Sequence, residues 1–260
     1  MMLNALVTGA GKRLGRSIAI YLAKRGFNVA IHYASSQIEA EQVANEIRKL
    51  QQIAITLQAD LLIENDVQNL LPRAQKALGG PITCLVNNAS IFEHDTLVTA
   101  TRLSWDRHIE SNLRAPFVLG QAMAFQGLST TVDKNNEPCA MGLIVNMIDQ
   151  RVRKLTPQFF TYTISKMGLW ALTQTLAQAL APVIRVNAIG PGPTLKGSRQ
   201  TEHHFNEQRK NTLLKRGANP EEICNTLGYF LDNCAVTGQL LCVDGGQHLA
   251  WQTPDVLGVE

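Results

Sequence analysis

The sequence lacks the features of disulfide-rich and membrane proteins. Its five cysteines, among 260 residues, are odd in number, widely spaced and without a CxxC or Cys/His pattern, so we expect reduced thiols with no metal role. No run approaches the about 20 apolar residues of a membrane span. The first residues lead straight into a strand pattern without a charged and then apolar signal region. We therefore expect a soluble, cytoplasmic protein that has no membrane partner.

An excess of charge of one sign is also missing. The 24 Lys and Arg residues nearly balance 21 Asp and Glu residues, which leaves a formal net charge of +3. The basic residues are scattered, whereas a nucleic-acid site requires them concentrated on one surface. No nucleic-acid partner is expected.

Short β-type runs alternating with helical patterns are the main feature that the chain does contain. The seven predicted strands are 3–8, 28–33, 53–58, 82–86, 143–147, 184–188 and 240–243. This alternation predicts an α/β fold: a single-domain, Rossmann-type, doubly wound, seven-stranded parallel sheet with helices on both faces. We expect one domain over residues 1–250 and a C-terminal tail over 251–260. The polar stretch 131–138 is interpreted as a surface loop before the fifth strand.

Proline and glycine gather in one later segment. Residues 191–199 contain two of each and precede an irregular helix-forming stretch, 202–215. This composition predicts a mobile flap at the rim of a site.

The segment TGAGKRLG, residues 8–15, ends the first predicted strand and opens a helix. In an open parallel sheet, ligands bind beyond the carboxyl ends of the strands. Gly9 permits a tight turn and Gly15 permits close packing, while the helix start offers free N–H groups to phosphate oxygens. Such turns can simply join a strand to a helix, but the position after the first strand favours a nucleotide pyrophosphate site.

The next strand end lacks the carboxylate with which NAD-binding proteins hold the ribose. Residues 27–38 contain no acidic side chain, and the sequence there includes Ser35 and Ser36. These hydroxyls can donate to a ribose 2′-phosphate, so NADPH is predicted rather than NADH. The serines can also cap the helix that begins near residue 37, and the two roles are compatible. Possible nearby cations are Lys12, Arg13 and His32.

An ordered set of motifs runs through the chain. It comprises the turn at 8–15, Asp60 in QADL, Asn87-Asn88-Ala89, Asn112 in SNL, Tyr162-Thr-Ile-Ser-Lys166, RVNAIGPG and VDGG. Together these motifs resemble the short-chain dehydrogenase/reductase family over nearly the whole length. TGAGKRLGRSIA, HY with a serine shortly after, NNASIF and an aspartate thirteen residues before the tyrosine are similar to its pteridine reductase subgroup. That subgroup has an arginine beside the serine after HY, whereas this chain has Ala34-Ser35-Ser36.

The resemblance implies where the cofactor and the substrate bind. The implied cofactor contacts are Gly9, Lys12, Arg13, Leu14, His32, Tyr33, Ser35, Ser36, Asp60, Leu61, Asn88, Ala89, Tyr162, Lys166, Pro191 and Gly192. The implied substrate contacts are Arg13, Ser90, Phe92, Asp149 and Tyr162. Arg13 replaces the middle glycine of the common family turn and would contact both phosphate and the substrate ring, unless it is merely solvated at a helix start. Phe92 would stack on a pterin, unless it is ordinary core packing.

Tyr162 and Lys166 carry the predicted acid–base chemistry. A lysine four residues later on the same helical face stabilises a tyrosinate and lowers the tyrosine pKa from its usual value near 10. By resemblance Lys166 also holds the nicotinamide ribose, and Asn112 holds a water that extends the proton relay. The alternative is a Tyr and a Lys that merely share a helix.

Asp149 stands where most family members have a serine. Reduction of a pterin C=N bond requires hydride on carbon and a proton on the adjacent nitrogen, and a carboxylate hydrogen-bonded to Tyr162 would help deliver that proton. The alternative is a loop carboxylate paired with Arg151 or Arg153.

These observations predict an NADPH-dependent reductase of pterin, dihydropterin or folate-like substrates. The alternatives are a general carbonyl or 3-oxoacyl reductase of the same family and a catalytically silent dinucleotide-binding protein. The resemblance further implies a homotetramer, and long apolar helices predicted at 101–124 and 157–180 favour it. The strand near 239–243 and the tail would make its second interface.

Overall fold

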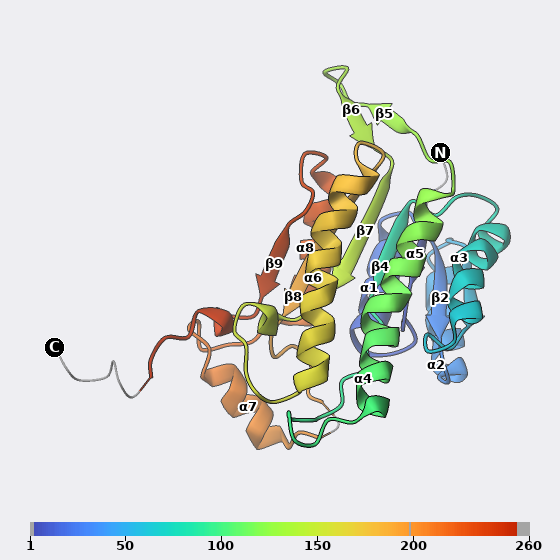
Figure 1. Ribbon diagram of the computed structural model, residues 1–260. Coiled ribbons are helices and arrows are strands. Elements are labelled where there is room, and N and C mark those ends of the chain that lie inside the picture. The colour runs from blue at the N-terminus through green and yellow to red at the C-terminus, as the bar shows by residue number, and fades with distance from the viewer. Residues whose placement is uncertain (1–2, 198, 254–260) are drawn as a thin grey trace.

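Seven parallel strands form the central sheet of the computed structural model, which describes residues 3–197 and 199–253 (Figure 1). The order across the sheet is β3-β2-β1-β4-β7-β8-β9. The strands are β1 (Asn4–Val7), β2 (Asn28–Tyr33), β3 (Ala54–Gln58), β4 (Cys84–Asn87), β7 (Gly142–Met147), β8 (Ile184–Pro191) and β9 (Leu240–Val243). All seven predicted strands are confirmed, and β8 extends three residues beyond its predicted end at 188.

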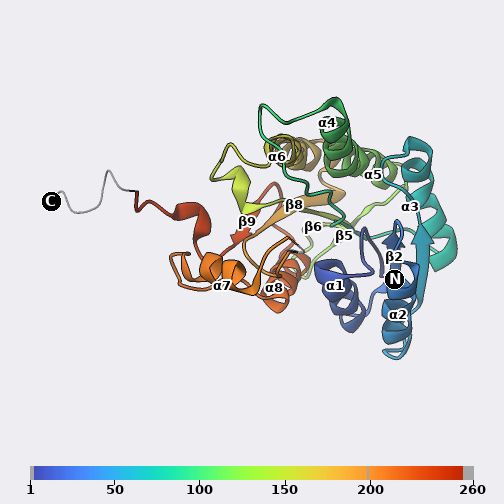
Figure 2. The same ribbon diagram turned by 90° about the horizontal axis from the view of Figure 1, so that it is seen from below.

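Helices cover both faces of the sheet (Figure 2). One face carries α1 (Arg13–Lys24), α2 (Gln37–Arg48) and α8 (Pro220–Asp232). The other carries α3 (Glu64–Leu78), α5 (Ala115–Ala124) and α6 (Phe160–Leu180). In α1 the apolar positions Ile18, Leu22 and the small Ala19 recur at helical spacing, and all three are fully buried against the strands. The strand order reverses between β1 and β4, which is where doubly wound sheets bind their ligands.

The helix predicted at 101–124 is divided in three. Thr101 caps α4 (Arg102–Ile109), a π-helical turn follows at Glu110–Arg114, and α5 continues the chain. The π turn carries Asn112, and such single turns occur frequently at functional sites. The helix predicted at 157–180 begins later, at Phe160.

The interpretation of residues 131–138 as a plain loop was wrong. They belong to an antiparallel hairpin of β5 (Thr130–Val132) and β6 (Pro138–Ala140). Asp133 organises its turn, because its Oδ1 accepts from the backbone N–H groups of Asn135 at 2.8 Å and Glu137 at 2.9 Å. The hairpin projects from the end of the sheet opposite the strand carboxyl ends (Figure 1). Its strands are only three residues long and lack a buried apolar face, so periodicity did not show them.

The segment after β8, residues 192–215, is called the flap below. It contains α7 (Glu202–Lys210), so the predicted helix 202–215 ends five residues early. Part of the expected tail, residues 254–260, lies outside the described residues, as does residue 198 within the flap. Among the residues that the structure describes, no helix is both long enough and apolar enough to cross a bilayer.

Candidate active site

The turn between β1 and α1 has the backbone of a phosphate-binding loop. Gly9 has a φ of +61° and Arg13 a φ of +54°, both in the left-handed region that favours glycine. A Cβ on Gly15 would lie 2.2 Å from the carbonyl oxygen of Gly9, so only glycine fits there. Arg13 thus adopts a glycine-like conformation with a cationic side chain, a strain typical of functional turns.

The Arg13 guanidinium reaches across to the flap. It donates to the carbonyl oxygens of Lys196 at 2.7 Å and Leu195 at 3.0 Å. The resemblance implies that Arg13 contacts phosphate and substrate, and the structure shows that its side chain also ties the flap to the turn. A solvated arginine without partners is not what the structure has.

The turn is also joined to the end of β4. Asn88 donates from Nδ2 to the carbonyl oxygens of Thr8 at 2.8 Å and Gly9 at 3.2 Å. The Thr8 hydroxyl accepts from the backbone N–H groups of Asn88 and Ala89, each at 2.9 Å. Sequence reasoning named Asn88 and Ala89 but missed Thr8, which locks the two strand ends at the point where the strand order reverses.

His32 supports the turn and does not supply a cation. Its Nδ1 accepts from the Gly9 N–H at 3.0 Å, and its Nε2 lies 3.1 Å from the Ala59 carbonyl oxygen. Burial lowers the pKa of His32 from 6.5 to about 4. The imidazole is therefore neutral near pH 7, and the prediction that His32 offers positive charge to a 2′-phosphate was wrong.

The serines after β2 lie beside the turn. Ser36 precedes α2 without a side-chain capping bond, and a Cβ on Gly11 would lie 3.0 Å from its Oγ. Ser35 is exposed. Lys12, one of the expected cations, forms an ion pair of 2.7 Å with Glu39, just beyond the acid-free stretch. Both hydroxyls thus remain available to a ligand, whereas Lys12 would have to leave Glu39 to reach one.

The other residues implied for the cofactor lie at neighbouring strand ends. Asp60 and Leu61 follow β3, where the Asp60 Oδ1 accepts from the Leu62 N–H at 3.0 Å. Pro191 ends β8, and Gly192 lies so close to Asp244 that a Cβ would meet its Cβ at 2.5 Å. Leu14 is half-buried in the first turn of α1, and Tyr33 is buried at the end of β2.

Asp149 and Tyr162 are in direct contact. The Tyr162 hydroxyl donates to Asp149 Oδ2 at 2.9 Å, while Asp149 Oδ1 accepts from the Arg151 backbone N–H at 2.8 Å. In the described part of the chain neither Arg151 nor Arg153 forms an ion pair with Asp149 through its side chain, so a mere loop salt bridge is excluded. The tyrosine hydroxyl is therefore hydrogen-bonded to a carboxyl that the backbone holds in place.

Burial shapes the protonation of this pair. It raises the pKa of Asp149, and it raises the pKa of Tyr162 well above 10, with the Asp149 charge as the next cause. Burial and Asp149 dominate here, so the lowering of the Tyr162 pKa by Lys166 stays a prediction. Tyr162 is a fully protonated donor, and the carboxyl beside it retains a proton more readily than an exposed aspartate does.

Lys166 lies one helical turn beyond Tyr162 but is held by the sheet. Its Nζ donates to the Met147 carbonyl oxygen at 2.8 Å and lies 5.7 Å from the centre of the Tyr162 ring. The side chain is 2% exposed, and burial lowers the pKa of Lys166 from 10.5 to about 8. Its remaining N–H groups can serve a hydroxyl-rich ligand beside Tyr162.

Asn112 joins three segments from its π turn. Its Oδ1 accepts from the Ile91 N–H at 2.9 Å and the Ser90 hydroxyl at 3.2 Å. Its Nδ2 donates to the Ile91 carbonyl oxygen at 2.9 Å and to Ser165 at 3.1 Å. All four bonds go to protein groups, so Asn112 positions the strand-end loop that carries Ser90 against α6.

Phe92 lies in an aromatic group beside Tyr162. Its ring stacks on Phe159 with centroids 4.3 Å apart and meets the Tyr162 ring edge-on at 4.6 Å. Phe92 is 43% exposed, so it is not core packing. The flap residue Arg199 covers this group, since it donates to the Phe92 carbonyl oxygen at 2.6 Å and lies 5.1 Å above the Phe92 ring.

Sequence reasoning missed Phe159 and Arg199. Phe159 has a φ of +56° immediately before α6, and its ring stacks on that of Phe92. No local sequence motif indicates either residue. Phe159 is distinguished by its backbone conformation, and Arg199 by a contact with a residue 107 positions away.

Comparisons with known proteins agree with this geometry. The family model described as enoyl-(acyl carrier protein) reductase matches residues 9–248. The 3-oxoacyl-[acyl-carrier-protein] reductase FabG of Staphylococcus epidermidis is 31% identical over 95% of this chain and 99% of its own.

Two solved structures extend the comparison. FolM alternative dihydrofolate reductase 1 from Brucella canis, complexed with NADP, is 46% identical with a TM-score of 0.89, over 98% of this chain and 97% of its own. A short-chain dehydrogenase from Burkholderia cenocepacia in complex with NADP is 30% identical with a TM-score of 0.84, over 94% and 97%. The NADP-type cofactor predicted from the serines is thus confirmed at the level of the family. With its glycine-rich turn, Tyr162 and Lys166 in place, this chain belongs to the short-chain dehydrogenase/reductase family and is an NADP-dependent oxidoreductase.

Proposed function

We propose that this protein is an NADPH-dependent reductase of pterin, dihydropterin or folate-like rings. The observation that carries the proposal is the hydrogen bond of 2.9 Å between Tyr162 and Asp149. Hydride addition to a ketone places the proton on oxygen, whereas hydride addition to a ring C=N bond places it on nitrogen. A carboxyl with a raised pKa beside a buried tyrosine suits the second reaction.

The residues of the site would have separate roles in that reaction. Hydride would come from the nicotinamide of NADPH, bound along the turn at residues 9–15 and the strand ends beside it. Tyr162 would donate its hydroxyl proton to the ring nitrogen. Asp149 would return a proton to Tyr162, and Lys166 would hold the ribose hydroxyls while its charge stabilises the oxygen that lost the proton.

The aromatic group supports a flat substrate. Phe92 is partly exposed, faces the Tyr162 ring and already stacks on another planar ring, that of Phe159. A pterin is a planar system of two fused rings and can adopt the same offset stacking. The 46% identity to an alternative dihydrofolate reductase, over nearly the whole of both chains, supports the same substrate class.

NADPH oxidation against a substrate panel tests the proposal. The panel contains biopterin, dihydrobiopterin and dihydrofolate, with acetoacetyl thioesters for comparison. We expect turnover with at least one pterin and little with the thioesters. The reverse result would assign the protein to carbonyl reduction.

A 3-oxoacyl or general carbonyl reductase is the second candidate. The 31% identity to 3-oxoacyl reductases over 95% of the chain favours it. Against it stands Asp149, which replaces the serine that most family members have there and whose two oxygens already accept from the Tyr162 hydroxyl and the Arg151 N–H.

A catalytically silent dinucleotide-binding protein is the third candidate. It is disfavoured because Tyr162, Lys166 and Asn112 are all present and packed together. Tyr162→Phe should abolish turnover and leave NADPH binding nearly unchanged, whereas equal turnover would remove Tyr162 from the mechanism.

We further propose a homotetramer in the cytoplasm. Supporting the assembly, α4 leaves Leu103 70% exposed and Trp105 41% exposed, Phe125 after α5 is 85% exposed, and Met167 on α6 is 37% exposed. The strand β9 and the tail would form the second interface.

A further inference from the structure

Two arginines lie against the aromatic group beside the active site. The Arg199 guanidinium lies 5.1 Å from the centre of the Phe92 ring and 5.4 Å from the centre of the Phe159 ring. The Arg151 guanidinium lies 5.2 Å from the centre of the Phe159 ring. Arg199 comes from the flap and Arg151 from the short helical turn after β7, so two separate segments bring positive charge to one place. We call these two residues the arginine pair.

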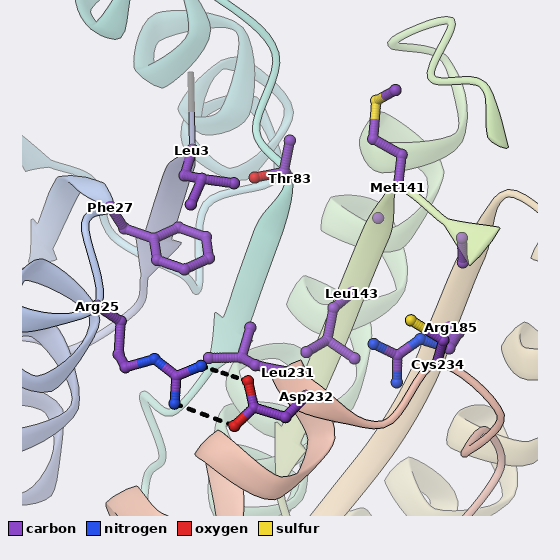
Figure 3. A pocket seen from close by; sticks show the side chains of 12 residues that line it. Leu3, Arg25, Phe27, Thr83, Met141, Leu143, Arg185, Leu231, Asp232 and Cys234 are labelled. Carbon is purple, nitrogen blue, oxygen red and sulfur yellow. Dashed lines mark hydrogen bonds and ion pairs between the residues drawn. The ribbon is translucent and has the colours of Figure 1, made fainter. Parts of the chain in front are cut away.

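Neither member of the arginine pair has a carboxylate partner. Ion pairs elsewhere in the described residues join arginines to acidic side chains, as Arg25 is joined to Asp232 in Figure 3. No ion pair within residues 3–197 and 199–253 includes Arg151 or Arg199. Two like charges therefore lie against the same ring without an opposite charge from this part of the chain to offset them.

The acidic side chains next to the aromatic group are bound to other partners. Glu93, which follows Phe92 in the chain, forms an ion pair of 2.9 Å with Arg107. The two oxygens of Asp149 accept from the Tyr162 hydroxyl and from a backbone N–H. The remaining donors of the arginine pair are thus open to an anion from outside the chain.

The arginine pair keeps free donors although its members are held in position. Arg199 is exposed and uses one bond, from Nη2 to the Phe92 carbonyl oxygen at 2.6 Å. Arg151 donates from Nη1 to the Thr156 hydroxyl at 2.5 Å, and its buried Nε has no partner among the described residues. A guanidinium has five N–H donors in a rigid plane and binds a carboxylate or a phosphate through two of them. Because contact with the aromatic rings restrains both groups, little conformational entropy is lost when an anion binds.

We propose that Arg151 and Arg199 form an anion-binding subsite that selects rings with a negatively charged side chain, a carboxylate or a phosphate ester, over rings with a neutral one. The inference rests on the proposed function, because it takes Phe92 as the surface on which the ring stacks. Both guanidinium groups lie within 5.4 Å of the centre of the Phe159 ring, which itself stacks on Phe92. A substituent that extends from the bound ring past Phe159 would therefore reach both of them.

Matched substrates test the inference with the purified full chain and NADPH. Dihydrofolate is compared with its uncharged glutamate diamide, and dihydroneopterin phosphate with dihydroneopterin, so each pair shares one ring and differs in charge. We expect kcat/KM to be at least about tenfold higher for the anionic member of one pair or both, the effect of one charge-assisted hydrogen bond. The pair that shows the preference distinguishes a carboxylate from a phosphate. The preference should shrink at about 1 M salt, where the Debye length is only about 3 Å.

The outcomes separate this inference from the proposed function. Turnover of these dihydropterins with equal kcat/KM within both pairs would overturn the inference and leave the proposed function intact. No turnover of any of the four compounds would overturn both.

Variants assign the preference to the arginine pair. Arg199→Gln removes the charge and should reduce the ratio of kcat/KM within the favoured pair about tenfold, and Arg151→Gln should reduce it as well. Arg199→Lys keeps the charge without the planar fork and should retain part of the ratio. Lys196→Gln is the matched control, because it removes a flap cation that is already paired with Glu202 at 2.9 Å, and it should leave the ratio unchanged.

Two results with these variants would overturn the inference. One is a ratio that stays the same in Arg199→Gln while the affinity for NADPH falls, since Arg199 would then serve the cofactor. The other is an equal loss of the ratio in Lys196→Gln, since the preference would then come from the general charge of the flap.

Discussion

The Tyr162 hydroxyl donates to Asp149 Oδ2 across 2.9 Å, and this bond joins the first turn of α6 to the chain that leaves β7. The start of α6 is held independently. Asp95 Oδ1 accepts from the Thr161 N–H at 3.1 Å, and the Thr161 hydroxyl lies 2.7 Å from His108 Nδ1. The position of Tyr162 thus does not depend on Asp149, so a change at Asp149 tests chemistry more than folding.

Replacement of Asp149 by serine should lower pterin turnover about 10²-fold or more, the usual size of general acid catalysis. NADPH affinity should stay nearly constant, because the nucleotide turn is built by other residues. Simple carbonyl substrates should improve, since a serine hydroxyl can donate to a carbonyl oxygen. Steady-state kinetics with both substrate classes measure the effect.

Asp149→Asn is the matched control for shape, and its melting temperature should be compared with that of Asp149→Ser. It keeps the size of the carboxyl but cannot supply a proton, so it should be as impaired on pterins. Unchanged pterin turnover in either stable variant would show that Asp149 is only a loop residue.

Activity should fall in alkaline solution through Lys166. Its pKa is lowered to about 8 by burial, so in the free enzyme the ammonium is lost above that pH and kcat/KM should drop about tenfold per pH unit. Its contribution to stability has the opposite sign. Between pH 8 and the unfolded value of about 10.4 the unfolded chain binds more protons, so the Lys166 contribution to the free energy of unfolding rises with pH.

Lys166→Arg separates that titration from others. Its guanidinium stays charged, so the variant should be slower but should lose the fall in kcat/KM above pH 8. An alkaline fall that persists unchanged in Lys166→Arg would assign it to another group.

His32 should make the fold sensitive to acid. Its pKa is lowered from 6.5 to about 4 in the folded protein, so the unfolded chain binds more protons between those values. Its contribution to stability is present above pH 6.5 and is lost as pH falls to 4, by about 3 kcal/mol. Between pH 7 and pH 5, urea unfolding should register about 2 kcal/mol of this loss, and His32→Asn should reduce the difference between the two.

NADPH should bind at least about tenfold more tightly than NADH, which corresponds to one charge-assisted hydrogen bond. Ser36→Asp should reverse the preference, because a carboxylate there repels the 2′-phosphate. Ser36→Asn, of the same shape without the charge, is the control. Fluorescence titrations that give equal dissociation constants for the two nucleotides in the unmodified protein would refute the assignment.

Light scattering at micromolar concentration should give the mass of four chains. Trp105→Glu on α4 should reduce that mass by disrupting one interface, since a charge cannot be buried there unpaired. Leu214→Glu is a control, because Leu214 is 71% exposed but lies in the flap. A monomeric mass for the unmodified protein would contradict the proposed assembly.

The sequence by itself determined the strands of the sheet and the positions of the Tyr162 and Lys166 pair along the chain. Each strand of the sheet contains a short apolar run between helical patterns, so all seven could be recognised locally, and the spacing between Tyr162 and Lys166 follows from one helix. The hairpin at 130–140 escaped because exposed three-residue strands have no buried face to generate a pattern.

Only the tertiary structure decided the protonation states in the site and the contact by which Arg199 covers Phe92. His32 is neutral and Tyr162 has a raised pKa because both are buried, and burial is a property of the packed fold rather than of neighbouring residues. The contact of Arg199 with Phe92 joins the flap to a residue 107 positions earlier in the chain, so no local pattern encodes it. Long-range packing and desolvation, which the chain acquires only when folded, set these features.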